Sequence, residues 1–82
     1  MNRSYTPVSC EIYSRYELAI LHRAWLRVLW HGRRGPRLER LLPLDLRTHR
    51  GAEYLIARTP GGVPRVMRLD RIRNAEPIEA AE

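Results

Sequence analysis

Beyond residue 23, apolar residues recur at every second position of the chain, and short segments rich in glycine and proline interrupt them. In the first such run, the alternate positions hold Ala24, Leu26, Val28 and Trp30. A period of two sends successive side chains to opposite faces, as in a half-buried β-strand. The interruptions at 31–36, 47–51 and 60–62 have the composition of tight turns. The pattern therefore predicts about five short antiparallel strands after residue 23.

The second predicted strand, which follows residue 36, alternates again. We assign one of its faces to leucines, namely Leu38, Leu42, Leu44 and Leu46, and the other to Arg37, Glu39 and Asp45. Pro43 falls on the outer face, and because proline cannot donate to a ladder it predicts an edge or a bulge. Further strands are expected at 52–58 and 63–69, with a last one around 72–78.

A helical period precedes the strands. Apolar residues recur at helical spacing through Ile12, Tyr16 and Ala19, which predicts one helix over about residues 10–20 with Ser9 as its N-cap. Residues 1–9 are expected to form an extended lead-in, and 76–82, with their glutamates, a frayed tail. The 82 residues predict a single domain, 1–82. The fold class is mainly β (α+β): an N-terminal helix followed by a small, closed or nearly closed, five-stranded antiparallel barrel, because closure protects sheet edges.

Arginine supplies all of the positive charge. Fifteen basic residues, none of them lysine, oppose nine acidic ones and give a net charge of +6. The guanidinium group pairs bidentately with phosphate or carboxylate, so the excess favours a polyanionic partner. The alternative is that arginine replaces lysine on a solvated surface. The predicted turns are basic, with Arg33 and Arg34 in the first and Arg47 and Arg50 in the second, while Trp25 either stacks on a base or packs beneath the helix.

Patterns that indicate an enzyme are weak. The three histidines lack metal-ligand spacing, Cys10 has no second cysteine beside it, and Gly61-Gly62 follows Pro60 in a turn and opens no helix. We therefore predict no catalysis, no metal and no cofactor. The first apolar stretch is interrupted by charged residues, so neither a secretory signal nor a membrane span is expected, and a cytoplasmic location is predicted.

Two distant blocks of the chain carry a recognisable order of residues. The first block comprises Tyr5, Pro7, Cys10, Tyr13, Glu17, Leu18, Ala19 and His22. The second comprises Glu53-Tyr54-Leu55 and Arg68-Leu69-Asp70, with Ile72 behind them. In order and spacing these residues resemble the Rho-binding antiterminator family (Rof), small bacterial inhibitors of the transcription termination factor Rho. The resemblance runs roughly from Met1 to Ile72 and implies an Sm-like barrel with an N-terminal helix.

The resemblance also implies a function and a site. Such a protein docks on the primary RNA-binding site of Rho, a hexameric helicase, and blocks RNA loading, so that transcription antitermination results. It implies partner-binding roles for Tyr13 and Glu17 on the helix, and for Arg47 and Arg50 in the turn before residue 52. The basic charge favours a second hypothesis, in which the module binds RNA directly. The residues of that alternative site are Arg33, Arg34, Arg47 and Arg50. No membrane and no small-molecule substrate are expected as partners.

Overall fold

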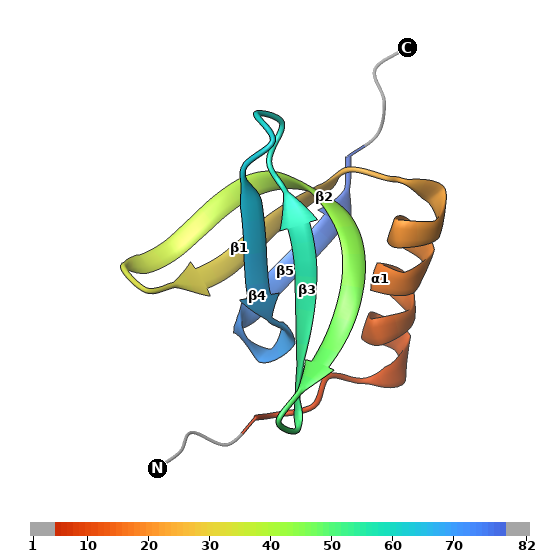
Figure 1. The fold of residues 1–82 in the computed structure, drawn as a ribbon, viewed down its shortest axis with the longest axis vertical. Coiled ribbons are helices and arrows are strands. Elements are labelled where there is room, and N and C mark those ends of the chain that lie inside the picture. The colour runs from red at the N-terminus through yellow and green to blue at the C-terminus, as the bar shows by residue number, and fades with distance from the viewer. Residues whose placement is uncertain (1–4, 79–82) are drawn as a thin grey trace.

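A computed structural model of the protein describes residues 5–78, which form one α-helix and five β-strands (Figure 1). The elements are α1 (Cys10–His22), β1 (Leu26–Gly32), β2 (Gly35–His49), β3 (Ala52–Arg58), β4 (Pro64–Arg68), the 3-10 helix η1 (Leu69–Arg71) and β5 (Ile72–Pro77). The predicted fold class, a helix followed by a small antiparallel sheet of five strands, is confirmed. Residues 5–9 form no helix or strand, and residues 1–4 and 79–82 lie outside the described part. Glu76 and Pro77, expected in the tail, belong to β5.

Local contacts set both ends of α1. The Ser9 hydroxyl accepts a hydrogen bond from the Ile12 amide at 3.2 Å, and Glu11 lies in the first turn, where the helix dipole favours a negative charge. At the other end Arg23 adopts φ 54°, and its amide donates to the carbonyl oxygens of Ala19 and Ile20. This left-handed cap ends the helix two residues later than predicted.

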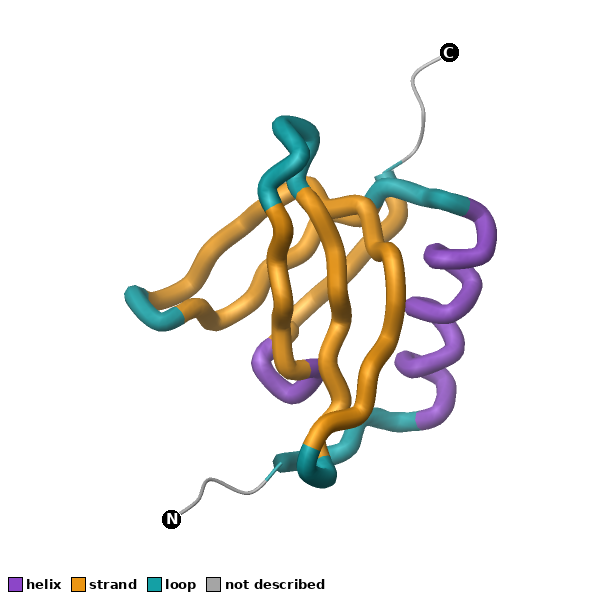
Figure 2. Tube along the Cα trace, viewed as in Figure 1, coloured by secondary structure: helices purple, strands orange, loops and turns teal. Residues whose placement is uncertain are grey.

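The sheet is open. Its strand order is β4-β3-β2-β1-β5, and each neighbouring pair is antiparallel, so β4 and β5 are edge strands. Of the two predicted forms, a closed or a nearly closed barrel, the closed one is therefore excluded. Consecutive in sequence, β4 and β5 lie at opposite ends of the sheet because η1 carries the chain between them. Figure 2 shows η1 as a short helical turn, and it contacts both β3 and β1. Between the edges formed by β4 and β5, the packing of η1 replaces a hydrogen-bonded ladder.

Strand β2 is 15 residues long and lies at the centre of the sheet. Its first half pairs with β1 and its second half with β3, and a register shift between Pro43 and Asp45 confirms the predicted bulge. The predicted faces of this strand are wrong. Leu41 and Pro43 are buried, whereas Leu38 is 65% exposed. Leu41 lies opposite Leu26 and Pro43 opposite Ala57. The apolar run 41–44 has no period of two, so the sequence could not distinguish its inner face.

The core lies on the concave side of the curled sheet. Its fully buried side chains come from β1, β2, β3, β4 and η1, and they are Val28, Leu41, Leu55, Met67 and Leu69. Helix α1 lies beside β2 and adds Tyr16 and Ala19 to this cluster (Figure 1). Burial raises the pKa of the Tyr16 hydroxyl, as expected of a phenol that is kept neutral inside the fold.

Candidate ligand-binding site

A hollow of about 520 Å³ lies beside β4, at one edge of the sheet. Its walls are the end of the β1–β2 hairpin, strand β4 and η1. Its lining includes five arginines and two aromatic residues, but no carboxylate among the described residues; they are Arg33, Arg37, Arg65, Arg68, Arg71, Trp30 and Tyr54. A guanidinium fork suits phosphate or carboxylate, and an aromatic face can stack on a planar ring. The hollow therefore combines the groups that recognise a nucleotide.

Glu39 does not line the hollow itself but contacts three residues that line one side of it. Its carboxylate accepts hydrogen bonds from the Trp30 indole at 2.9 Å and from Arg65 Nε at 3.1 Å. The Arg37 Nε lies 3.7 Å from the same carboxylate, and the Arg37 guanidinium lies 5.8 Å from the centre of the Trp30 ring. Because the Glu39 side chain is only 13% exposed, these contacts are partly shielded from water. One carboxylate thus positions two arginines and an aromatic ring on three strands.

Asp70 organises the other side. It receives two hydrogen bonds from Arg68, at 2.7 and 3.0 Å, and a third from the Thr6 amide at 3.1 Å. Burial alone would raise the pKa of Asp70, but these hydrogen bonds and the charges of Arg68 and Arg71 lower it overall. The Arg68 guanidinium also lies 5.8 Å from the centre of the Tyr5 ring. The lead-in is therefore tied to β4 and η1.

Tyr5 continues this cluster across to β3. Its hydroxyl donates to Glu53 at 2.9 Å. Burial, the bond to Glu53 and the negative charges of Glu53 and Asp70 raise the pKa of Tyr5 well above its usual range. Several residues from both distant sequence blocks thus contact one another. Their visible role is to hold the N-terminal segment against the sheet.

Arg33 and Arg71 are the cations of the hollow that remain available. Within residues 5–78, neither side chain makes an ion pair or a hydrogen bond, and both residues are exposed. A smaller hollow, lined by His31, Arg68, Asp70, Arg71 and Arg73, adjoins the first one and shares three of its residues. An anion entering here would find unpaired guanidinium groups on two sides.

The arginines predicted from the turns do not form one site. Arg33 and Arg34 lie at the tip of the β1–β2 hairpin and Arg50 at the tip of the β2–β3 hairpin, and these tips project from different corners (Figure 1). Of the predicted set, only Arg33 lines the hollow. Arg47 is held by Asp45, whose carboxylate lies 2.7 Å from its Nε, and this bond lowers the pKa of Asp45.

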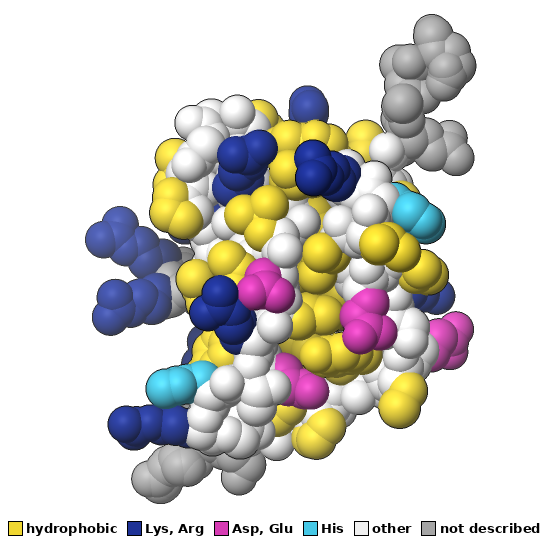
Figure 3. Space-filling model, turned by 45° about the vertical axis from the view of Figure 1, so that its right-hand side comes forward, with side chains coloured by type: hydrophobic (Ala, Val, Ile, Leu, Met, Phe, Trp, Pro, Cys, Tyr) yellow, Lys and Arg dark blue, Asp and Glu magenta, His cyan; other side chains and the backbone are white. Residues whose placement is uncertain are grey.

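Tyr13 and Glu17 lie on a different face. Burial raises the pKa of Tyr13, and the charges of Glu53, Glu17 and Asp45 raise it further, which places all three carboxylates around this ring. Figure 3 shows acidic side chains over hydrophobic surface at the centre and right of that view, with basic side chains mainly at its left and top. The face of the protein around Tyr13 is thus acidic, although the whole chain is basic.

Sequence reasoning missed Arg37, Arg65, Arg68 and Arg71 as members of a site. They lie on β2, β4 and η1, and only the curl of the sheet brings them together. The available signal was the spacing of three between Arg65, Arg68 and Arg71, at the end of a strand that alternates. Trp25, considered for stacking, is half-buried just before β1, and Trp30 lines the hollow instead.

Neither a metal-ligand cluster nor a membrane-spanning helix is found among residues 5–78. Within 5–78, no group of three or more His, Cys, Asp or Glu side chains is arranged to hold a metal ion. The described helices include none that is both long and apolar enough to cross a membrane.

Comparison with known proteins identifies a family. Residues 11–77 match the model of the WYL domain. The fold is also similar to that of proteasome accessory factor B/C (PafBC) of Arthrobacter aurescens, with a TM-score of 0.78 and 24% sequence identity. The similarity covers 98% of this chain but only 13% of the PafBC chain. No curated protein matches the sequence.

These matches correct the resemblance to Rof and the function inferred from it. The match to the WYL domain spans most of both sequence blocks that carried that resemblance, so the inferred membership of Rof and inhibition of Rho are wrong. The roles toward Rho that followed for Tyr13, Glu17, Arg47 and Arg50 have no support. The structure offers a physical reason for the error. Tyr5, Glu53 and Asp70 are held by mutual contacts of the fold, so their order reports architecture rather than a partner. By the match over residues 11–77, the chain belongs to the WYL domain family.

Proposed function

We propose that this chain is the ligand-binding part of a transcription regulator and that the arginine-lined hollow binds a nucleotide, either free or within a single strand of nucleic acid. The observation that carries the proposal is the set of five arginines around Trp30 and Tyr54. Arginine forks would take the phosphates, and the aromatic rings would stack on the base. Membership of the WYL domain family and the likeness in fold to PafBC support a role in transcription regulation. Such a role requires the cytoplasmic location that the sequence predicted.

The electrostatic layout supports the same proposal. Glu39 and Asp70 hold three of the arginines in place, while Arg33 and Arg71 keep their hydrogen-bonding capacity. Held groups need little reordering when a ligand binds, so less conformational entropy is lost. Conversely, the acidic face around Tyr13 repels phosphate, which directs an anion toward the hollow.

Equilibrium binding of fluorescent probes tests this function. We would measure fluorescence polarisation with a labelled single-stranded DNA oligonucleotide and, separately, with a labelled mononucleotide, each over a series of salt concentrations. Binding should weaken as salt rises, because phosphate contacts release counterions. A preference for the mononucleotide assigns the hollow to a free effector, and a preference for the oligonucleotide assigns it to nucleic acid.

Paired variants with equal charge loss make the test specific. Arg33→Ala with Arg71→Ala removes two cations from the hollow and should weaken binding by about tenfold or more, at roughly 1.4 kcal/mol per factor of ten. Arg34→Ala with Arg58→Ala removes two exposed cations that do not line it and should change affinity little. Equal losses in both variants would indicate diffuse attraction to surface charge and would contradict a site in the hollow. Absence of binding at low salt would do the same.

A further inference from the structure

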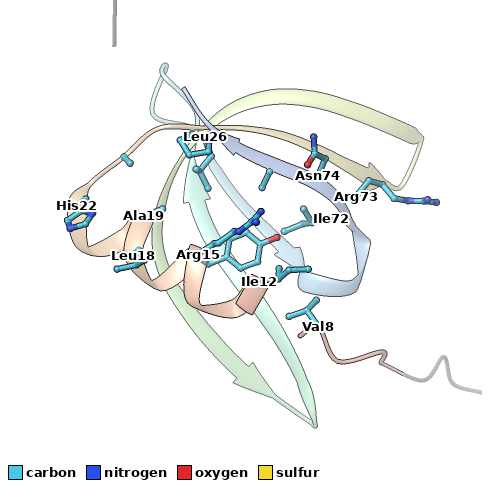
Figure 4. Close-up of a pocket in the computed structure, with 14 residues that line it drawn as sticks. Val8, Ile12, Arg15, Leu18, Ala19, His22, Leu26, Ile72, Arg73 and Asn74 are labelled. Atoms are coloured by element: carbon cyan, nitrogen blue, oxygen red, sulfur yellow. The ribbon is translucent and has the colours of Figure 1, made fainter. Parts of the chain in front are cut away.

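A second cavity of about 520 Å³ lies between α1 and β5, away from the arginine-lined hollow (Figure 4). Its lining is mainly apolar and comes from the lead-in, one side of α1, the start of β1 and most of β5. The apolar members are Val8, Ile12, Tyr16, Leu18, Ala19, Ala24, Leu26, Ile72, Ala75 and Pro77. Ile12 and Leu18 are 40% and 53% exposed, so apolar surface faces water along this groove. We refer to this cavity as the α1–β5 groove.

One wall of the groove is the free edge of β5. Among the described strands, β5 pairs with β1 alone. The amide of Ile78 donates toward β1, to the Trp25 carbonyl at 3.0 Å. Because backbone groups alternate in an antiparallel ladder, Ala75 and Pro77 direct theirs away from β1, whereas Arg73 is the extra residue of a bulge opposite Leu29 and Trp30. Consecutive residues from Ile72 to Ala75 line the cavity, as expected of a groove along an edge rather than over one face.

The charge of the groove comes from two arginines, Arg15 and Arg73. His22 also lines it, and no carboxylate does among the described residues. Arg15 has a weak partner, Glu11 at 3.9 Å, and both side chains are largely exposed. Arg73 has no ion pair or hydrogen bond within residues 5–78. In Figure 4, Arg15 extends over the cavity from α1, while Arg73 lies at the β5 side.

We propose that the α1–β5 groove binds an extended, acidic peptide segment of a partner protein, which adds a strand to the free edge of β5. Main-chain hydrogen bonds to the amide and carbonyl groups of Ala75 and to the carbonyl group of Pro77 would supply the pairing, and alternate apolar side chains would cover Ile12 and Ile72. Carboxylates of the same segment would pair with Arg15 and Arg73. This inference goes beyond the proposed nucleotide site, because the α1–β5 groove and the arginine-lined hollow share no lining residue.

Selection from a random peptide display library, with the full 82-residue chain as target, tests the proposal. The enriched peptides should alternate apolar residues and contain aspartate or glutamate. Hydrogen exchange should then show new protection of the Ala75 amide in the complex with a synthetic copy of the strongest peptide. Enrichment of helical spacing, of basic peptides, or of no consensus would overturn the proposal.

Two charge-reversal pairs locate the binding site of that peptide. Arg15→Glu with Arg73→Glu should weaken its binding by about tenfold or more, since two ion pairs become repulsive. Arg27→Glu with Arg40→Glu makes the same change in net charge at exposed residues outside the groove, and should have a much smaller effect. Equal effects of the two pairs would overturn the proposal.

A backbone variant separates strand addition from simple attraction. Ala75→Pro removes one amide at the free edge while leaving the ladder to β1, and β5 already holds Pro77. It should weaken the binding of the peptide by several fold, and thermal melting checks that the variant is folded. If this variant does not fold, N-methylation of alternate peptide amides provides the same test from the ligand side, and unchanged affinity would overturn the proposal.

Two other occupants are distinguishable outcomes. Saturable binding of decanoate, with no enriched peptide, would assign the groove to a small amphipathic anion. Concentration-dependent dimerisation in sedimentation, abolished by Arg15→Glu with Arg73→Glu, would assign it to a second copy. Either result would overturn the proposal. In both cases the binding of oligonucleotide or mononucleotide probes to the arginine-lined hollow should be unchanged.

Discussion

The two edge strands of this sheet, β4 and β5, face very different surroundings. Strand β4 borders a hollow lined by arginines, whereas β5 borders a groove lined mainly by apolar residues. The same topology produces both, because a sheet that does not close leaves one free edge at each end. An open sheet of about eighty residues can therefore present two chemically distinct surfaces, one at each edge. Closure would have removed both of them.

The largest change should come from Leu69, which supports both regions. It is 1% exposed and lies in η1, which contacts β1 and β3 between the two edges. Leu69→Ala should lower the free energy of unfolding by about 2–5 kcal/mol, because it leaves a cavity in the core. Urea denaturation measures this loss. Leu38→Ala, at a residue 65% exposed, is the matched control and should change stability by no more than about 0.5 kcal/mol.

Asp70 should affect the arginine-lined hollow and not the α1–β5 groove. Asp70→Asn should lower the free energy of unfolding by about 1–3 kcal/mol at pH 7, since charge-assisted hydrogen bonds from Arg68 are lost. The lowered pKa of Asp70 means that its contribution is present above the usual carboxyl value of 3.8 and is lost as the pH falls through the folded value. The difference between the two proteins should therefore shrink from pH 6 to pH 3.

Asp45 is the matched control for this pH dependence. It accepts similar bonds, from Arg47 at 2.7 Å and from the Leu46 amide at 2.9 Å, but it is more exposed than Asp70. Asp45→Asn should therefore have a smaller effect at pH 7. An equal loss in the two variants would show that burial does not strengthen the Asp70 contacts.

Glu39 should have an intermediate effect, again confined to the arginine-lined hollow. Glu39→Gln removes the charge that holds Arg65 and Arg37, and should lower the free energy of unfolding by about 1–2 kcal/mol. The fluorescence of Trp30 should change as well, since its indole donates to this carboxylate. Glu11→Gln, in an exposed pair at 3.9 Å, should be nearly neutral in urea denaturation. A neutral Glu39→Gln would mean that the arginines of the hollow are not held in place.

The smallest effect should fall on the α1–β5 groove alone. Ser9→Ala removes the N-cap of α1, one wall of that groove, and should lower the free energy of unfolding by about 1 kcal/mol. Hydrogen exchange in the first turn of α1 should accelerate, while binding to the arginine-lined hollow should not change. Ser14→Ala, at an exposed position inside the helix, should be neutral or slightly stabilising.

Local patterns allowed most of the elements to be predicted, and tertiary arrangement explains what was missed. The alternation through Leu26 and Val28 and the glycine-containing turns were sufficient for the strands, because both act within a few residues. The sequence did not decide between a closed and a nearly closed barrel, because closure depends on tertiary packing around η1. The arginine-lined hollow was missed for the same reason: Arg37 and Arg65 are far apart in sequence and meet only through Glu39.

The pairing of β1 with β5 has a consequence for folding kinetics. Its register joins Leu26 to Pro77, whereas the hairpins β1–β2, β2–β3 and β3–β4 join neighbours in sequence. Long chain closures lose more entropy before contacts compensate them, so we expect the hairpins to form first and β5 to dock last. Pulse-labelled hydrogen exchange during refolding should show late protection of the Glu76 and Ile78 amides. The chain then completes its sheet and creates the α1–β5 groove in one step.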